Sequence, residues 1–143
     1  MSGISDMGRF VTHYGTGHLN GMSHETIIRR ELLRAPVGHR SVSTVDVREI
    51  AFAPGQQTGR HYHPCPVVGY IAEGAAVLQI EGHEPQFLST GTAFHEPAQA
   101  VIARFDNASR TAPLKFIAYY LLNGHESLIE MLPDASEVSV DQS

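Results

Sequence analysis

Residues 55–74, GQQTGRHYHPCPVVGYIAEG, contain the strongest local pattern in the 143-residue sequence. His61 and His63 are two positions apart, so on a strand they project from one face while Tyr62 projects from the other. Two neutral imidazoles that converge on one point suit zinc, iron, nickel, copper or manganese. The alternative is that both histidines lie exposed in a loop beside Pro64. The pair therefore predicts a metal site if its face is the interior of the protein.

The pattern of the sequence around this pair is typical of an all-β protein. From Glu25 onward, short apolar runs rich in β-branched residues are divided every eight to twelve residues by Gly, Pro or Asp clusters. Partial alternation in residues 41–52 suggests a bulge or a register change there. Short antiparallel strands without long helical patterns leave a sandwich or a closed barrel. The predicted strands are residues 26–33, 41–52, 67–72, 75–81, 92–96, 100–104 and 114–122.

The length of the chain predicts one domain, since domains most often have about 100 to 150 residues. Residues 1–24 contain scattered glycines and no apolar period, so we expect an N-terminal arm. Residues 25–132 should form the barrel. Residues 133–143 are acidic and serine-rich, which predicts a flexible tail.

Composition excludes several classes of protein. The formal charge of −5 and the isoelectric point near 5.9 argue against nucleic acid as a partner. The sequence has no basic-apolar leader and no apolar run long enough for a membrane, so a cytoplasmic location without membrane partners is expected. A lone cysteine, Cys65, cannot form an internal disulfide.

Residues 32–122 resemble the cupin superfamily, which implies an all-β double-stranded β-helix, or jelly-roll, barrel. Its first motif places a glycine, two histidines and a second glycine at the spacing of Gly55, His61, His63 and Gly74, but Val67 stands where the family has a glutamate ligand. In the second motif Gly91 and Pro97 fit the pattern. There Gln99 replaces a glycine, Ile102 replaces a ligand histidine, and Asp106 or Asn107 stands at the asparagine.

His95 and Glu96 are available to complete the metal site just before the turn at Pro97. Adjacent strand residues face opposite sides, so a regular strand turns one of them inward, and the sequence leaves open which one. Either is a candidate metal ligand or general acid/base. The other role is at the surface, or as a carboxylate that orients a metal-bound histidine.

Apolar residues should enclose the site. We expect Val67, Ile71 and Ile102 to shape a dry pocket. Arg104 shares the parity of Ile102, so it either lines the interior and holds an anionic group or is a solvated strand-end arginine. Counting every second residue from His61 and His63, we expect Tyr70 to face outward.

These patterns lead to a metal-dependent cupin enzyme as the first hypothesis. It would be a dioxygenase-like oxygenase, an isomerase or a lyase that acts on a small organic molecule and uses one divalent transition metal ion (Fe, Zn, Ni, Mn or Cu). The alternative is a non-catalytic cupin module that senses a small molecule or a metal. The resemblance also implies a homodimer, because small cupins commonly pair through strands or an N-terminal arm.

Overall fold

A computed structural model describes residues 25–134. The expected N-terminal arm, residues 1–24, and residues 135–143 of the expected tail lie outside this range. The described residues divide into a short segment, 25–34, and a β-structured unit from Ala35 onward.

Residues 25–34 do not form the strand expected over 26–33. The apolar residues there come as adjacent pairs, Ile27-Ile28 and Leu32-Leu33, rather than at every second position. Adjacent residues of a strand face opposite sides, so these pairs build no single apolar face. All four side chains are exposed in the structure.

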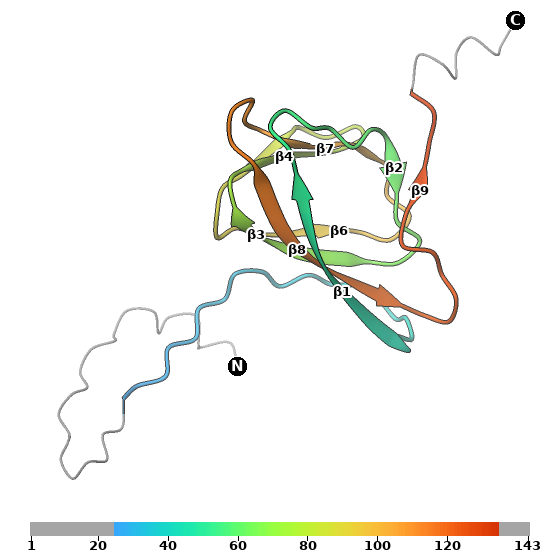
Figure 1. Cartoon of the computed structure of the whole chain (residues 1–143). Helices are drawn as coiled ribbons and strands as arrows, with labels where there is room; N and C mark the ends of the chain where they lie inside the picture. Colours follow the sequence, from blue (N-terminus) through green and yellow to red (C-terminus); the bar gives the residue numbers. More distant parts are fainter. Residues whose placement is uncertain (1–24, 135–143) are drawn as a thin grey trace, which may run out of the picture. The chain divides into compact units, whose positions relative to one another are not determined.

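The β-structured unit consists of two sheets whose strands pair antiparallel throughout. One sheet has the order β1-β8-β3-β6 and the other the order β5-β4-β7-β2-β9. The two sheets face each other in Figure 1, as in a jelly-roll barrel. The predicted all-β architecture is confirmed. The strands are β1 (Thr44–Phe52), β2 (His61–Tyr62), β3 (Val67–Glu73), β4 (Ala76–Ile80), β5 (Gln86–Leu88), β6 (Ala93–Glu96), β7 (Ile102–Asn107), β8 (Leu114–Leu122) and β9 (Glu130–Met131).

Alternation along β8 shows how the sequence builds the core between the sheets. Every second residue from Leu114 to Leu122 is buried, and the residues between them are more exposed. Four phenylalanines from four strands complete the core with ring centroids 4.7 to 6.3 Å apart: Phe52, Phe94, Phe105 and Phe116. Such tilted and edge-to-face pairs are the favoured geometry of aromatic rings. Gly69 makes room for one of them, because a Cβ there would lie 2.2 Å from the ring of Phe94.

Bulges occur at other places than expected. The β1–β8 ladder is continuous from Thr44 to Phe52, so residues 41–52 contain no bulge in their strand. Register shifts instead occur in β3 after Ile71 and between β4 and β7. In the second case Gln79 pairs with Arg104 but Ile80 pairs with Ile102, which leaves one extra residue in β7. A bulge of this kind reverses the facing of the residues beyond it.

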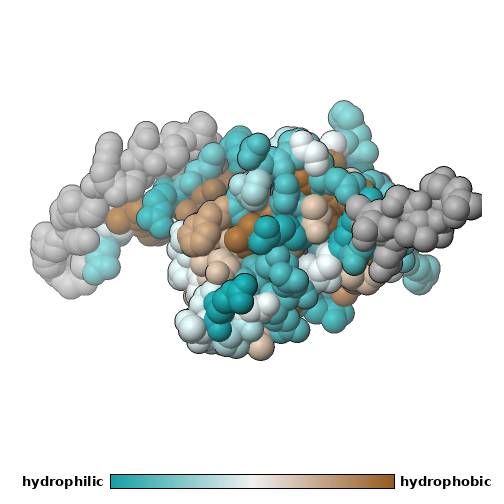
Figure 2. All heavy atoms as spheres, turned by 90° about the horizontal axis from the view of Figure 1, so that it is seen from above, coloured by the Kyte–Doolittle hydropathy of each residue, from teal (hydrophilic) through white to brown (hydrophobic). Residues whose placement is uncertain are grey.

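The surface of the described part is mixed. Within residues 25–134, no helix is long and apolar enough to span a membrane. On the face in Figure 2, hydrophilic residues predominate and separate hydrophobic patches interrupt them.

Candidate metal centre

His61, His63 and Glu96 converge inside the barrel. One ligand atom from each lies within 4.8 Å of the others, and all three residues are buried. Nε2 of His63 lies 2.6 Å from Oε1 of Glu96, and Nε2 of His61 lies 3.9 Å from the same oxygen. Buried carboxylates are rare unless they are paired or bind a metal. The three side chains form one buried polar cluster.

Backbone carbonyls orient both imidazole rings. Nδ1 of His61 lies 2.8 Å from the carbonyl oxygen of Gly59, and Nδ1 of His63 lies 2.8 Å from that of Leu128. A carbonyl only accepts hydrogen bonds, so each Nδ1 carries a proton and donates it. In the neutral ring this leaves the lone pair on Nε2, which faces Glu96. Metal-binding histidines are usually held in this way through their other nitrogen.

Attraction between the carboxylate of Glu96 and the two imidazoles outweighs the effect of burial on the charges of the cluster. Burial alone would raise the pKa of Glu96, but the hydrogen bond with His63 and the nearby imidazole of His61 hold it below its ordinary value. Burial likewise opposes a charge on His63, yet the bond to Glu96 and its negative charge outweigh burial and raise the pKa of His63. Nε2 of His63 and Oε1 of Glu96 are only 2.6 Å apart, so without a metal one proton lies between them. A metal cation would replace that proton.

Glu96 of β6 is paired, on the neighbouring strand β3, with Val67, the residue that stands where the first motif has a glutamate. Side chains of directly paired residues share a face, with Cβ atoms roughly 5 Å apart. Similarly, Ile102 pairs with His61, so an apolar residue occupies the place of the missing histidine. A carboxylate is thus present on the neighbouring strand, whereas no histidine takes the place of Ile102 in residues 25–134.

His95 lies on the opposite face of β6 from Glu96, and it does not join the cluster. It pairs with Val68, whose neighbour on β8 is Tyr119, and these three residues face away from the cavity. The structure thus settles which of the two adjacent residues points inward, because β6 is regular up to Glu96. Burial lowers the pKa of His95. Its Nε2 is buried and has no hydrogen-bond partner among residues 25–134.

A cavity of about 150 Å³, partly open to solvent, adjoins the cluster. His61, His63 and Glu96 form its polar end. Its other walls are almost entirely apolar, and they are Ile50, Phe52, Val67, Phe94, Phe105, Phe116, Ala118 and Ile129, with Thr58 and Tyr120 as further polar residues. A cavity of this composition can hold a small, mostly apolar molecule with a polar group at one end.

The expected pocket residues divide into three groups. Val67 lines the cavity. Ile71 and Ile102 are fully buried in the core but do not line it. Arg104 does not line the cavity: of the two roles considered for it, its exposed side chain matches the solvated arginine and not the inward-facing one. The bulge in β7 turns Phe105 inward, and Arg104 points to an open groove on the outside, where Nε donates to Asp106 at 2.9 Å.

Tyr120 is a cavity residue that the sequence interpretation missed. It lies on the inward face of β8, and its ring centroid is 5.8 Å from that of His63. Burial and the charge of Glu96 raise the pKa of Tyr120 to about 12, so its phenol is protonated at neutral pH. Counting every second residue from Leu114 would have identified this position.

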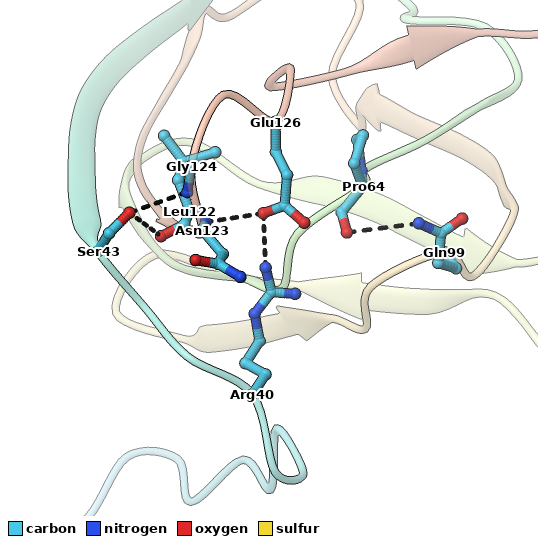
Figure 3. Close-up of polar contacts among 8 residues, drawn as sticks. All are labelled: Arg40, Ser43, Pro64, Gln99, Leu122, Asn123, Gly124 and Glu126. Atoms are coloured by element: carbon cyan, nitrogen blue, oxygen red, sulfur yellow. Dashed lines mark hydrogen bonds and ion pairs between the residues drawn. The ribbon is translucent and has the colours of Figure 1, made fainter.

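Two loops hold the backbone next to His63. The amide N–H of Gln99 donates to the carbonyl oxygen of His63 at 2.8 Å, and the Gln99 side chain reaches toward the carbonyl of Pro64 (Figure 3). Gln99 has a φ of 71°, in the left-handed region that favours glycine. The loop that follows β8 carries Leu128, whose carbonyl accepts from the ring of His63. The site is thus set by loops as well as by strands.

Comparisons with known proteins agree with this architecture. Residues 48–120 match the model of the cupin domain family. A cupin-like protein from Thermotoga maritima is 23% identical over 66% of this chain and 68% of its own, with a TM-score of 0.55. A DMSP lyase from Ruegeria pomeroyi is 18% identical over 61% of this chain and 42% of its own, with a TM-score of 0.53.

An oxalate oxidase in complex with the substrate analogue glycolate is also similar, at 21% identity over 62% of this chain, with a TM-score of 0.52. The chain spans less than half the length of the lyase and of the oxidase. At these identities the likeness shows the fold alone. No curated protein matches the sequence.

Proposed function

The chain belongs to the cupin domain family, and we propose that it binds one divalent transition metal ion through His61, His63 and Glu96 and acts on a small organic molecule in the adjoining cavity. The observation that carries this proposal is the buried cluster of two imidazole nitrogens and one carboxylate oxygen at the end of a cavity. The expected ligand role of His95 is not part of it, because that side chain faces away.

The donor set fits a transition metal. Two histidines and one carboxylate are the ligands of many non-haem iron sites, and the same donors also suit zinc, nickel, manganese or copper. Both Nε2 atoms are directed inward by hydrogen bonds on the Nδ1 side. A bound ion with three protein ligands would supply Lewis-acid or oxygen chemistry at its open positions.

The cavity narrows the class of substrate. An apolar cavity of about 150 Å³ holds a molecule of roughly benzene size. Four phenylalanine rings suit an apolar or aromatic body, and the polar end suits one carboxylate, hydroxyl or carbonyl group. Tyr120 lies beside His63 and keeps its proton at neutral pH, so it can donate a hydrogen bond to that group. The proposed reactions are those of an oxygenase, an isomerase or a lyase.

Elemental analysis of the protein, purified without a histidine tag, tests the proposal. The wild type should contain close to one equivalent of a transition metal, and the double variant His61→Ala/His63→Ala should contain almost none. A matched control is His39→Ala/His83→Ala, which removes two exposed histidines and should keep the metal. Equal metal content in the wild type and the His61/His63 variant would refute the site.

A non-catalytic cupin that senses a small molecule or a metal is the second candidate. The observation that favours it is Ile102, which leaves the site one histidine short of the family pattern. Oxygen consumption and product analysis with small carboxylic acids and phenols separate the two functions. A metal-loaded protein that binds these compounds in its cavity but leaves them unchanged would support the sensor.

The outer face of the first sheet supports the expected homodimer. Val45, Val47, Tyr70 and Tyr119 project from it and are 53%, 54%, 39% and 38% exposed. A second copy that covered this face would remove apolar surface from water. Light scattering should give twice the mass of one chain, and Val47→Asp should reduce it to one chain. A monomeric wild type at micromolar concentration would contradict the expectation.

A further inference from the structure

We propose that Arg40 and Glu126 are positioning residues for His63: their ion pair holds the loop 123–128 so that the carbonyl of Leu128 accepts the Nδ1 proton of His63. Neither residue touches the cavity. The expected effect of the two residues on metal binding rests on the proposed metal site. Their effect on the Nδ1 proton of His63 does not.

The pair joins two segments that are far apart in the sequence. Nη2 of Arg40 lies 2.5 Å from Oε1 of Glu126, across 86 positions. In Figure 3 the guanidinium of Arg40 reaches from the segment before β1 to the loop after β8. The two side chains are 17% and 28% exposed, whereas those of the local Arg48–Asp46 pair are 54% and 26% exposed. Because the Arg40–Glu126 pair is partly buried, dissolved salt screens its attraction less than it screens that of an exposed ion pair.

Further hydrogen bonds fix the start of the same loop. Oε1 of Glu126 also accepts from the amide of Asn123 at 2.8 Å. The hydroxyl oxygen of Ser43 accepts from the amide of Gly124 at 2.9 Å. The segment 40–43 therefore holds the loop at two points, and Glu126 is the point nearer to His63 along the chain.

The connection from Glu126 to His63 is short. Leu128 follows two residues later, a distance of at most about 7 Å along the backbone. Its carbonyl accepts from Nδ1 of His63 at 2.8 Å, its side chain packs on the core, and Ile129 next to it lines the cavity. A displacement of Glu126 thus moves both the acceptor of His63 and one cavity wall.

Loss of this acceptor would release the imidazole of His63. Its ring could then rotate or exchange the proton between its two nitrogens, and Nε2 would no longer face Glu96 at all times. If the ion pair only stabilised the loop, the protein would melt at a lower temperature while the ring of His63 behaved as before. The state of the Nδ1 proton distinguishes these two roles.

The first experiment uses the metal-free, ¹⁵N-labelled protein. Long-range ¹H–¹⁵N spectra report the Nδ1–H of His63, which His63→Ala assigns by its disappearance. We expect a slowly exchanging proton in the wild type and rapid exchange with water in Arg40→Ala. Arg40→Lys keeps the charge and lacks the Nε that is buried without a partner in residues 25–134, so slow exchange should return.

Two more variants complete this experiment. Glu126→Gln keeps an oxygen for the amide of Asn123 and removes only the charge, so it should fold and still speed up the exchange. Glu49→Gln removes the carboxylate that lies 3.9 Å from Lys115 on the outside of the barrel and should change nothing. Wild-type exchange rates in folded Arg40→Ala and Glu126→Gln would overturn the inference.

The second experiment measures binding of Co²⁺ to the same proteins. Arg40→Ala and Glu126→Gln should weaken it about tenfold, at the low end of the loss typical for partners of metal ligands, and should alter the visible spectrum of the bound ion. Arg40→Lys should restore both. Failure of the wild type to bind Co²⁺ would refute the proposed metal site, whereas the exchange of the Nδ1 proton still decides the role of Arg40 and Glu126. Unchanged affinity and spectrum in the variants, next to a wild type that binds, would count against that role.

Discussion

The two segments that meet at the cavity follow the cupin pattern to different extents. The β2–β3 segment keeps both histidines and has Val67 in place of the glutamate, while the β6–β7 segment has Ile102 in place of the histidine. Nevertheless the carboxylate is present, because Glu96 of β6 pairs directly with Val67. Side chains at directly paired positions of neighbouring strands lie close together on the same face of the sheet. A motif read along one segment therefore underestimates such a site.

The largest effect is expected from a contrast within β6. Glu96→Gln should lower the affinity for a divalent metal by more than about 100-fold, because it removes the one charged donor of the cluster. His95→Gln, one residue away on the outer face, should change the affinity less than about threefold. Isothermal titration with Zn²⁺ or Co²⁺ measures both. A larger loss in His95→Gln than in Glu96→Gln would reverse the assignment of the two residues.

An exchange of the paired residues tests whether the ladder relation matters. Glu96→Val alone should abolish metal binding, and Val67→Glu/Glu96→Val should return the carboxylate to the family position and restore affinity to within about tenfold of the wild type. The same titration provides the answer. Should the double variant bind no better than Glu96→Val, the position of the carboxylate on β6 would be essential.

Substitution of Gln99 in the β6–β7 turn should have a smaller effect, which is on the stability of the fold. Gln99→Gly should raise the free energy of unfolding by about 0.5 to 1 kcal/mol, because glycine adopts the φ of 71° without strain. Gln99→Ala loses the same weak side-chain contact to Pro64 but keeps a Cβ, so it should not gain this stability. Urea denaturation compares the three proteins, and equal stability of the two variants would contradict the explanation by strain.

The smallest expected effect is a dependence of stability on pH through Glu126. The amide of Asn123 and the guanidinium of Arg40 hold the pKa of Glu126 below its ordinary value of 4.5. A lowered pKa in the folded state means that the stabilisation is complete above the pKa of the unfolded chain and disappears as the pH falls through the folded value. The stability difference between wild type and Glu126→Gln should thus be constant above about pH 5 and shrink below 4.5. Urea denaturation at several pH values measures it, and a difference that grew on acidification would refute this account.

Much of the fold follows from local patterns. Alternation in Leu114–Leu122 and the glycine and proline turns around Val67–Glu73 specify strands, since side chains of a strand alternate between water and core. Short strands such as β5 and β9 escaped prediction, because two or three residues carry no measurable period. Ile27, Ile28, Leu32 and Leu33 suggested a strand by composition although they lack alternation.

For the site, the sequence by itself determined the histidine pair, because two residues at i and i+2 of a strand share a face wherever the strand lies. Only the tertiary structure decided that Glu96 rather than His95 joins them, that Tyr120 lies beside them and that Arg104 does not. Each of these depends on strand register or on a bulge, and register is set by pairing between distant segments. A shift of one residue reverses the facing of every side chain beyond it, and no local pattern records where that shift occurs.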